Sequence, residues 1–130
     1  MLNVAILGSG NIGTDLLVKT MRSPYLRCLL LAGRNNSSKG LAFAESLNVR
    51  TSVEGIEAIK NAGENIDLVF DATSASSHIK HSDVFKHMGV KAIDMTPSHI
   101  GMPVVPNLNG RENIYTENVN MVTCGGQTSI

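Results

Sequence analysis

The sequence has few cysteines, no long apolar run and no excess of charge of either sign. Its 130 residues include two cysteines, eleven basic residues and eleven acidic residues. No stretch reaches the roughly 20 apolar residues of a membrane span. A formal net charge of zero argues against nucleic acid as the main partner. Two widely separated cysteines, Cys28 and Cys124, do not make a disulfide framework, so we expect a reduced, cytoplasmic protein.

The remaining composition is that of an ordinary globular chain. Hydrophobic residues make up 42% and charged residues 17% of the sequence. A chain of this length is typical of one domain with a real core, here residues 1–130. No basic region or cleavage site precedes the first apolar stretch, so the sequence gives no sign of a signal peptide.

A glycine-rich turn near the N-terminus is the most informative motif. The apolar run Val4–Leu7 predicts a strand buried on both faces of a parallel sheet. Gly8, Gly10 and Gly13 follow at the G-x-G-x-x-G spacing, and a helical pattern begins directly after them. This strand, turn and helix context is typical of dinucleotide binding, in which the pyrophosphate approaches the backbone at the helix N-terminus. The alternative is a plain glycine-rich turn.

Apolar spacing and breakers predict alternating strands and helices. Together these elements predict an α/β fold of the Rossmann type, a doubly wound, mostly parallel sheet. The expected helices are Asn11–Met21, Leu41–Leu47, one around Ile56 and Ile59, and Ser77–Met88. The expected strands, after the first, are Leu26–Ala32, Val49–Thr51, Ile66–Ala72, Val90–Met95, a short piece at Val104 and Val105, and Asn120–Thr123.

The last residues have the pattern of a helix of which only the first residues are present. Cys124, Gly125 and Gly126 form a sharp turn, and Gln127–Ile130 reads as the start of a helix. We therefore expect the chain to be the N-terminal nucleotide-binding part of a longer protein, with a C-terminal substrate and dimerisation domain absent.

Four stretches carry a resemblance to one family. They are GSGNIGTDL at 8–16, VFDATSA at 69–75, DMTPSHIG at 94–101 and VNMVTCGGQ at 119–127. In this order and spacing the chain resembles the acylating acetaldehyde dehydrogenases, and the resemblance covers almost all of it. It implies oxidation of acetaldehyde or a similar short aldehyde with a nicotinamide cofactor, and transfer of the acyl group to coenzyme A as co-substrate.

Cys124 matches the nucleophile of that family. The residues also support this role, because a helix N-terminus lowers the pKa of a thiol and the bare N–H groups of two glycines suit an oxyanion. The implied mechanism is covalent: the thiolate adds to the aldehyde, hydride leaves, and a thioester remains. The alternative is a buried cysteine before a glycine turn.

The resemblance also assigns the cofactor site. It implies that the turn residues Gly8, Ser9, Gly10, Asn11, Ile12 and Gly13 line the phosphates of NAD. Thr73, Ser74 and Ala75 follow a strand at the carboxyl edge of the sheet, where they can meet the ribose or the nicotinamide. Alternatively, Thr73 and Ser74 cap the following helix.

Arg34 lies where the chain departs from the family. The end of the second strand should offer an acid to the ribose hydroxyls, and the family commonly has an aspartate there, but this chain has Gly33, Arg34 and Asn35. Arg34 can accept a 2′-phosphate, which leaves both NAD and NADP open as cofactor. The alternative is an exposed loop arginine.

His78 and His81 are three residues apart on an expected helix, with Asp83 and His87 nearby. That spacing permits a metal pair. We interpret them instead as polar histidines on a helix face and expect no metal site.

Two other functions remain open. One is a semialdehyde or acyl-phosphate reductase of similar architecture, with phosphate replacing coenzyme A, against which the VTCGGQ block argues. The other is a non-catalytic nucleotide-binding fragment. The resemblance further implies a homodimer, a partner aldolase of the 4-hydroxy-2-oxovalerate type and a place in aromatic hydrocarbon catabolism.

Overall fold

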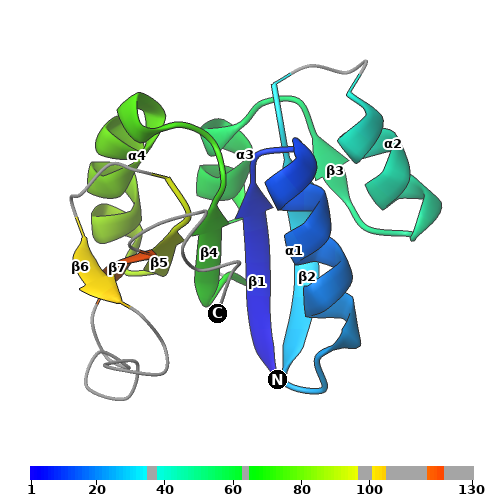
Figure 1. Cartoon of the computed structure of the whole chain (residues 1–130), viewed down its shortest axis with the longest axis horizontal. Helices are drawn as coiled ribbons and strands as arrows, with labels where there is room; N and C mark the ends of the chain where they lie inside the picture. Colours follow the sequence, from blue (N-terminus) through cyan, green and yellow to red (C-terminus); the bar gives the residue numbers. More distant parts are fainter. Residues whose placement is uncertain (35–37, 63–64, 97–100, 105–116, 122–130) are drawn as a thin grey trace.

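A parallel sheet with helices on both faces forms the structure, which is a computed structural model (Figure 1). It describes residues 1–34, 38–62, 65–96, 101–104 and 117–121. Within these ranges, seven strands lie in the order β3-β2-β1-β4-β5-β7-β6, and every strand pairing is parallel. The expected doubly wound α/β fold is therefore confirmed.

The elements alternate along the chain as the apolar spacing predicts. The strands are β1 (Leu2–Leu7), β2 (Leu26–Ala32), β3 (Thr51–Ser52), β4 (Leu68–Asp71), β5 (Lys91–Asp94), β6 (Met102–Val104) and β7 (Asn118–Met121). The helices are α1 (Asn11–Arg22), α2 (Lys39–Ser46), α3 (Ile56–Asn61) and α4 (Ala75–Met88).

The predicted ends of several elements are wrong by a few residues. Helix α4 begins at Ala75 rather than Ser77, because the Ser74 side chain caps it and accepts from the Ser77 N–H. Helix α2 begins at Lys39 for the same reason, since Ser38 accepts from the Gly40 N–H. The last strand is Asn118–Met121, earlier than predicted, because it pairs with β5 from Asn118 onward.

Two apolar layers enclose the sheet. Helices α1 and α2 cover one face, where Leu17, Leu41 and Ala44 pack on Val4 and Ile6. Helices α3 and α4 cover the other face, where the contacting residues are Ala58, Ile59, Phe85, Ala5, Leu7, Leu30 and Val69. Strand β1 is thus buried from Val4 to Leu7, as the uninterrupted apolar run predicts.

Close backbone contact decides which face of α1 meets the sheet. A side chain at Gly13 would overlap the carbonyl oxygen of Gly8, so the helix lies directly on the turn that precedes it. Gly13, Leu17 and Thr20 are consequently the buried residues of α1. The apolar residues Ile12 and Met21 lie off this face and are 44% and 47% exposed.

The chain changes direction in the sheet at β1. After β1 it moves outward through β2 to β3, and it then returns to β4 on the other side of β1 (Figure 1). This reversal is the topological switch point, where open α/β sheets bind ligands outside the carboxyl ends of the strands. The glycine turn, Arg34 and Thr73 all follow strands at this edge.

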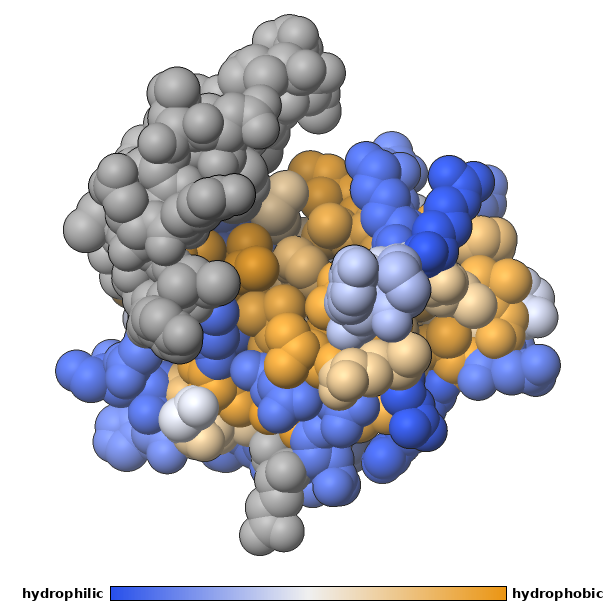
Figure 2. All heavy atoms as spheres, turned by 90° about the horizontal axis from the view of Figure 1, so that it is seen from below, coloured by the Kyte–Doolittle hydropathy of each residue, from blue (hydrophilic) through white to orange (hydrophobic). Residues whose placement is uncertain are grey.

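The opposite edge of the sheet, at the amino ends of the strands, exposes apolar residues. Figure 2 shows the molecule from below the view of Figure 1, with apolar residues exposed among polar ones. Met1 and Leu2, at the amino end of β1, are 79% and 51% exposed. No helix in the described part of the chain has the length and apolar character that a membrane span requires.

Candidate functional site

The turn Gly8–Gly10 is held tightly by its surroundings. Gly8 has a φ of +115°, which favours glycine, and a Cβ there would lie 2.6 Å from the carbonyl oxygen of Ala72. Side chains at Gly13 and Gly40 would overlap the carbonyl oxygens of Gly8 and Ser9. Internal packing therefore explains why these three positions are glycine.

Gly10 is different, because neither its backbone angle nor a contact with any described residue requires a glycine there. Its φ is −78°, an ordinary value for any residue, and no described atom lies within 4 Å of where its Cβ would be. It is also exposed and directly precedes α1, whose first turn has no side-chain cap. The bare backbone at Gly10 thus leaves an open approach to the free N–H groups of the helix.

A hollow of about 450 Å³ opens beside Gly10 at the switch point. We call it the strand-end hollow. Its walls come from the ends of β1, β2 and β4 and from the start of α3. The lining residues are Leu7, Gly8, Ser9, Gly10, Ala32, Gly33, Arg34, Glu54, Gly55, Ile56, Ala72, Thr73, Ser74 and His81.

The structure brings together most, but not all, of the predicted cofactor residues. Gly8, Ser9, Gly10, Arg34, Thr73 and Ser74 line the strand-end hollow. Asn11 lines instead an open groove of about 620 Å³ between α1 and α2, which shares Ser9 and Gly10 with the hollow. Gly13 is buried beneath the turn, and neither Ile12 nor Ala75 lines either space.

Ser74 caps α4, as one of the two alternatives for it predicted, and its contact with a cofactor stays a prediction. Its hydroxyl oxygen accepts from the Ser77 N–H at 3.2 Å and so caps α4, and the residue also lines the strand-end hollow. Thr73 donates its N–H and its hydroxyl to Asp71 Oδ1 at 3.1 and 2.5 Å. Thr73 is therefore fixed by the carboxylate at the end of β4.

Cys124, the predicted nucleophile, lies outside the described residues, as do Asn35 and Gly125–Ile130. Cys28 is partly buried beside the apolar cluster of α1 and α2. Burial raises the pKa of the Cys28 thiol to about 11, which keeps it protonated at neutral pH.

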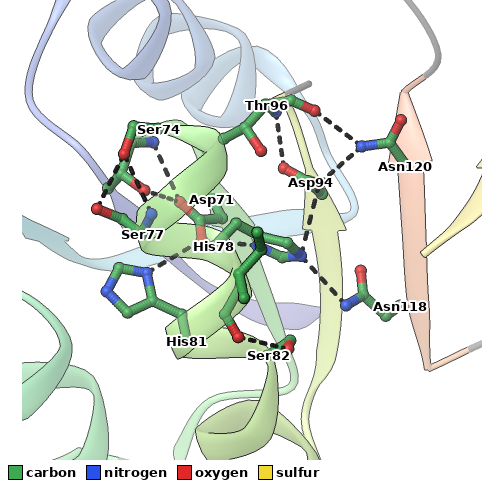
Figure 3. Close-up of polar contacts among 12 residues, drawn as sticks. Asp71, Ser74, Ser77, His78, His81, Ser82, Asp94, Thr96, Asn118 and Asn120 are labelled. Atoms are coloured by element: carbon green, nitrogen blue, oxygen red, sulfur yellow. Dashed lines mark hydrogen bonds and ion pairs between the residues drawn. The ribbon is translucent and has the colours of Figure 1, made fainter. Parts of the chain in front are cut away.

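Sequence reasoning missed a buried polar network next to the hollow (Figure 3). We call it the histidine network. Its members are Asp71 on β4, His78 and His81 on α4, Asp94 on β5, and Asn118 and Asn120 on β7. Asp71, His78 and Asp94 are fully buried, so the interpretation of His78 as a polar histidine on a helix face was wrong.

His78 lies between two aspartates. Its Nδ1 is 2.7 Å from Asp71 Oδ2, and its Nε2 is 3.5 Å from Asp94 Oδ2. His81 approaches the same oxygen of Asp71 through Nδ1 at 3.2 Å. Since an ionised carboxylate only accepts, His78 carries a proton on Nδ1 in either charge state.

Asn118 can satisfy both charge states of His78. Its side-chain amide lies 3.1 Å from Nε2 with the nitrogen toward the ring, as a neutral imidazole requires. Its Oδ1 is buried without a hydrogen bond among the described residues. A half turn of the amide would direct this oxygen to the ring and accept the second proton of an imidazolium.

The surrounding charges favour the imidazolium. Burial alone would lower the pKa of His78, but the hydrogen bond to Asp71, the negative charges of Asp94 and Asp71, and the contact with Asn118 raise it above its ordinary value of 6.5. Burial alone would likewise raise the pKa of Asp71. Hydrogen bonds from His78, His81 and Thr73 instead hold it far below its usual range.

The second carboxylate of the network holds β7. Asp94 accepts from the Thr96 N–H at 2.7 Å and from Asn120 Nδ2 at 2.6 Å. Asn120 also donates to the Thr96 carbonyl at 2.8 Å.

Among the described residues, no three histidine, cysteine, aspartate or glutamate side chains are placed to hold a metal ion together.

The fold, the glycine turn and the strand-end hollow define a nucleotide-binding α/β domain of the Rossmann type. Comparison with known proteins gives the family. Residues 3–116 match the semialdehyde dehydrogenase NAD-binding domain, so the chain belongs to that family.

Relatives of high identity are acetaldehyde dehydrogenases. The chain is 48% identical over 128 residues to the enzyme of Spirochaeta aurantia and 50% identical over 129 residues to that of Pectobacterium atrosepticum. Each alignment covers 98% of this chain but only 43% and 44% of the relative. The chain therefore spans less than half the length of the curated relatives it matches.

Solved structures show the same fold at low identity. Biliverdin reductase from Synechocystis, in complex with biliverdin and NADP⁺, matches with a TM-score of 0.68 and 19% identity over 91% of this chain and 37% of its own. An NAD-binding protein from Listeria innocua matches with a TM-score of 0.67 and 17% identity over 92% of this chain and 35% of its own. These similarities establish the fold alone.

The paired shifts of His78 and Asp71 predict a pH dependence of stability. A raised histidine pKa stabilises the fold fully below about pH 6.5, and this contribution is lost as the pH rises through the folded-state pKa. The lowered Asp71 pKa stabilises the fold above about pH 3.8 and is lost as the pH falls toward the folded-state pKa.

Chemical denaturation from pH 3 to 10 measures this dependence. We expect His78→Gln to remove the loss of stability on the alkaline side and to lower the free energy of unfolding by about 3–5 kcal/mol near pH 6, because it leaves a buried charge uncompensated. His87→Gln, at an exposed residue of the same helix, is the matched control. Equal pH profiles for unmodified protein and His78→Gln would contradict the assignment.

Proposed function

We propose that this chain is the NAD(P)-binding part of an acylating aldehyde dehydrogenase that oxidises acetaldehyde or a similar short aldehyde to acyl-coenzyme A. The observation that carries cofactor binding is Gly10, whose missing side chain neither packing nor backbone angle explains. A pyrophosphate approaching this position gives the glycine a reason. The identity of close to half with acetaldehyde dehydrogenases supports the aldehyde substrate.

The described residues fit a dinucleotide. The bare backbone around Gly10 and the first turn of α1 would hold the pyrophosphate. Arg34 and Glu54 lie at the β2 side of the strand-end hollow, and Thr73 and Ser74 lie at its β4 side. When bound, the nicotinamide supplies the hydride acceptor.

Cys124 is the proposed nucleophile. Its thiolate forms a C–S bond to the carbonyl carbon of the aldehyde, and the resulting thiohemiacetal loses hydride to become a thioester. The thiol of coenzyme A then attacks the thioester carbonyl and releases the Cys124 thiolate. The C-terminal half of the full-length relatives would supply the substrate surface, a homodimer contact and a partner aldolase, and we expect the enzyme to work in the cytoplasm.

A second candidate is an acyl-phosphate reductase. The chain belongs to the family of the semialdehyde dehydrogenase NAD-binding domain, which favours this second function. In that reaction phosphate takes the place of coenzyme A in attack on the thioester. A full-length protein that forms acyl-coenzyme A but no acyl phosphate supports the first function, and the reverse result supports the second. Cofactor binding without either product supports a non-catalytic domain.

The first prediction of this function concerns Gly10. Gly10→Val should reduce NAD(P) affinity at least tenfold, because a branched side chain would stand where the pyrophosphate approaches, while the open space around Gly10 leaves the fold unchanged. Gly13→Val is the contrasting variant, because its side chain would overlap the Gly8 carbonyl and unfold the turn. Calorimetric titration and circular dichroism measure both effects. Unchanged affinity in Gly10→Val would place the cofactor elsewhere.

The second prediction concerns cofactor selectivity. The sequence offers no acid directly after β2, but Glu54 reaches the same hollow from the β3–α3 turn, where the Gly55 N–H donates to the Gly33 carbonyl at 3.0 Å. Arg34 suits a 2′-phosphate, and Glu54 suits a free 2′-hydroxyl. We expect NADP to bind at least as well as NAD.

Arg34→Ala should therefore weaken NADP binding by about 10- to 100-fold, the range of a lost charge-assisted hydrogen bond, and weaken NAD binding less. Glu54→Gln should weaken NAD more than NADP. Arg22→Ala, at the far end of α1, is the control. A strong preference of the unmodified chain for NAD would contradict the role of Arg34.

The third prediction concerns Cys124. In the full-length protein, iodoacetamide should label Cys124 readily near pH 7, in line with a lowered thiol pKa, while the 130-residue chain should label as an ordinary thiol and turn over little or no aldehyde. Peptide mass after labelling across pH 6–10 gives both profiles. Cys28, whose pKa is about 11, is the internal control. Equal profiles for Cys124, or robust acyl-coenzyme A formation by the short chain, would contradict the prediction.

A further inference from the structure

We propose that His78 is a positioning residue that joins Asp71 and Thr73, which lie at the end of β4 beside the strand-end hollow, to strand β7, which precedes Cys124 in the sequence. The proposal rests on the proposed function for the identity of the cofactor and of the nucleophile. The network that carries it consists of described residues on three neighbouring strands and one helix (Figure 3).

One arm of the network shapes the wall of the strand-end hollow. His78 Nδ1 donates to Oδ2 of Asp71, which leaves Oδ1 to accept from the N–H and the hydroxyl of Thr73. One oxygen of the Asp71 carboxylate is thus held by His78, and the other oxygen holds Thr73. The carbonyl of Ala72, between them, packs against Gly8 of the glycine turn. A change at His78 therefore reaches the residues that would contact cofactor.

The other arm holds β7. His78 Nε2 contacts the side-chain amide of Asn118 at 3.1 Å, and Asp94, 3.5 Å from Nε2, binds Asn120 at 2.6 Å. β7 is a short strand of four residues, and its last residue, Met121, precedes Cys124 by three positions in the sequence. Side chains at two of its four residues thus tie it to the network, in addition to its pairing with β5 and β6.

The groups around His78 favour its charged form. Asp71 faces it from β4, Asp94 from β5 and Asn118 from β7, while His81 and Phe85 lie beside it on α4. His81 shares Asp71 Oδ2 with His78 and also lines the hollow. Loss of the second proton of His78 would leave the hydrogen bonds of Nδ1 to Asp71 and of Nε2 to Asn118 in place but would remove the cation between Asp71 and Asp94, and the electrostatic attraction in both arms would weaken together.

Two substitutions separate the arms. The amide of His78→Asn stands near the position of Nδ1 and keeps a donor for Asp71, whereas the amide of His78→Gln reaches toward Nε2 and keeps a partner for β7. Each is made in the full-length protein. We expect His78→Gln to weaken NAD(P) binding at least tenfold and His78→Asn to change it less than threefold.

The β7 readouts should show the opposite order. The labelling rate of Cys124 by iodoacetamide, and amide hydrogen exchange at Val119 and Asn120, should change strongly in His78→Asn and little in His78→Gln. A role in stability alone would lower the melting temperature of both variants but leave cofactor affinity and Cys124 labelling at the values of the unmodified protein. That outcome, or equal effects of the two substitutions on both readouts, would overturn the proposal.

A measurement without substitution at His78 covers the case in which the variants do not fold. NAD affinity of the unmodified protein should fall as the pH rises through the titration of His78, followed by the ring resonances in NMR, and His81→Gln should retain this fall. Affinity that is independent of pH, or a fall that disappears in His81→Gln, would overturn the proposal. If the unmodified protein binds neither NAD nor NADP, the proposed function itself is wrong.

Discussion

The structure depends on the packing of backbone against backbone around the turn Gly8–Gly10. Helix α1 lies on this turn at Gly13, helix α2 at Gly40, and the end of β4 at Gly8. In each case a single Cβ would meet a carbonyl oxygen at less than a normal contact distance. Because three elements meet the backbone of Gly8 and Ser9, the glycine turn sets how closely they approach one another and forms part of the wall of the strand-end hollow. Gly10 alone is left with open space, so the same packing that closes the turn on three sides leaves one side for a ligand.

Patterns local in sequence predicted the fold well. The buried run Val4–Leu7, the glycine spacing and the alternation of strands and helices each depend on neighbours within a few residues, and the parallel sheet followed from their order. Errors in the ends of elements came from side-chain caps. Ser74 begins α4 earlier than apolar spacing indicates, because a hydroxyl can satisfy the free N–H groups of a first turn that carries no large apolar residue.

The histidine network could not be predicted in the same way, because its contacts span 40 residues of sequence between His78 and Asn118. A histidine in a helix rich in serine and lysine resembles a surface residue, and only the pairing of β4, β5 and β7 encloses it. Ile79 shows the same effect in reverse, since it is an apolar residue next to His78 in the sequence and yet is 53% exposed. The buried face of α4 is defined by His78 and Phe85, which are seven residues apart. Aspartates that end the apolar strands IDLVFD and KAID were the available signal, because a carboxylate in a buried strand requires a partner.

Stability alone does not account for this network. Burial of charges removes them from water, and well-packed apolar residues in place of a buried ion pair are often neutral or stabilising. An apolar residue in place of His78 would nevertheless lose the directional hydrogen bonds, since it could neither orient the Asp71 carboxylate toward Thr73 nor hold Asn118 of β7. Hydrogen bonds fix angles and distances that dispersion contacts do not, and the proposed reaction, which would bring a thiolate, an aldehyde carbon and a hydride acceptor into line, would require such fixed geometry. The network lies between the wall of the strand-end hollow and the strand that precedes Cys124 in the sequence, so under the proposed function that precision would act on both the cofactor and the nucleophile.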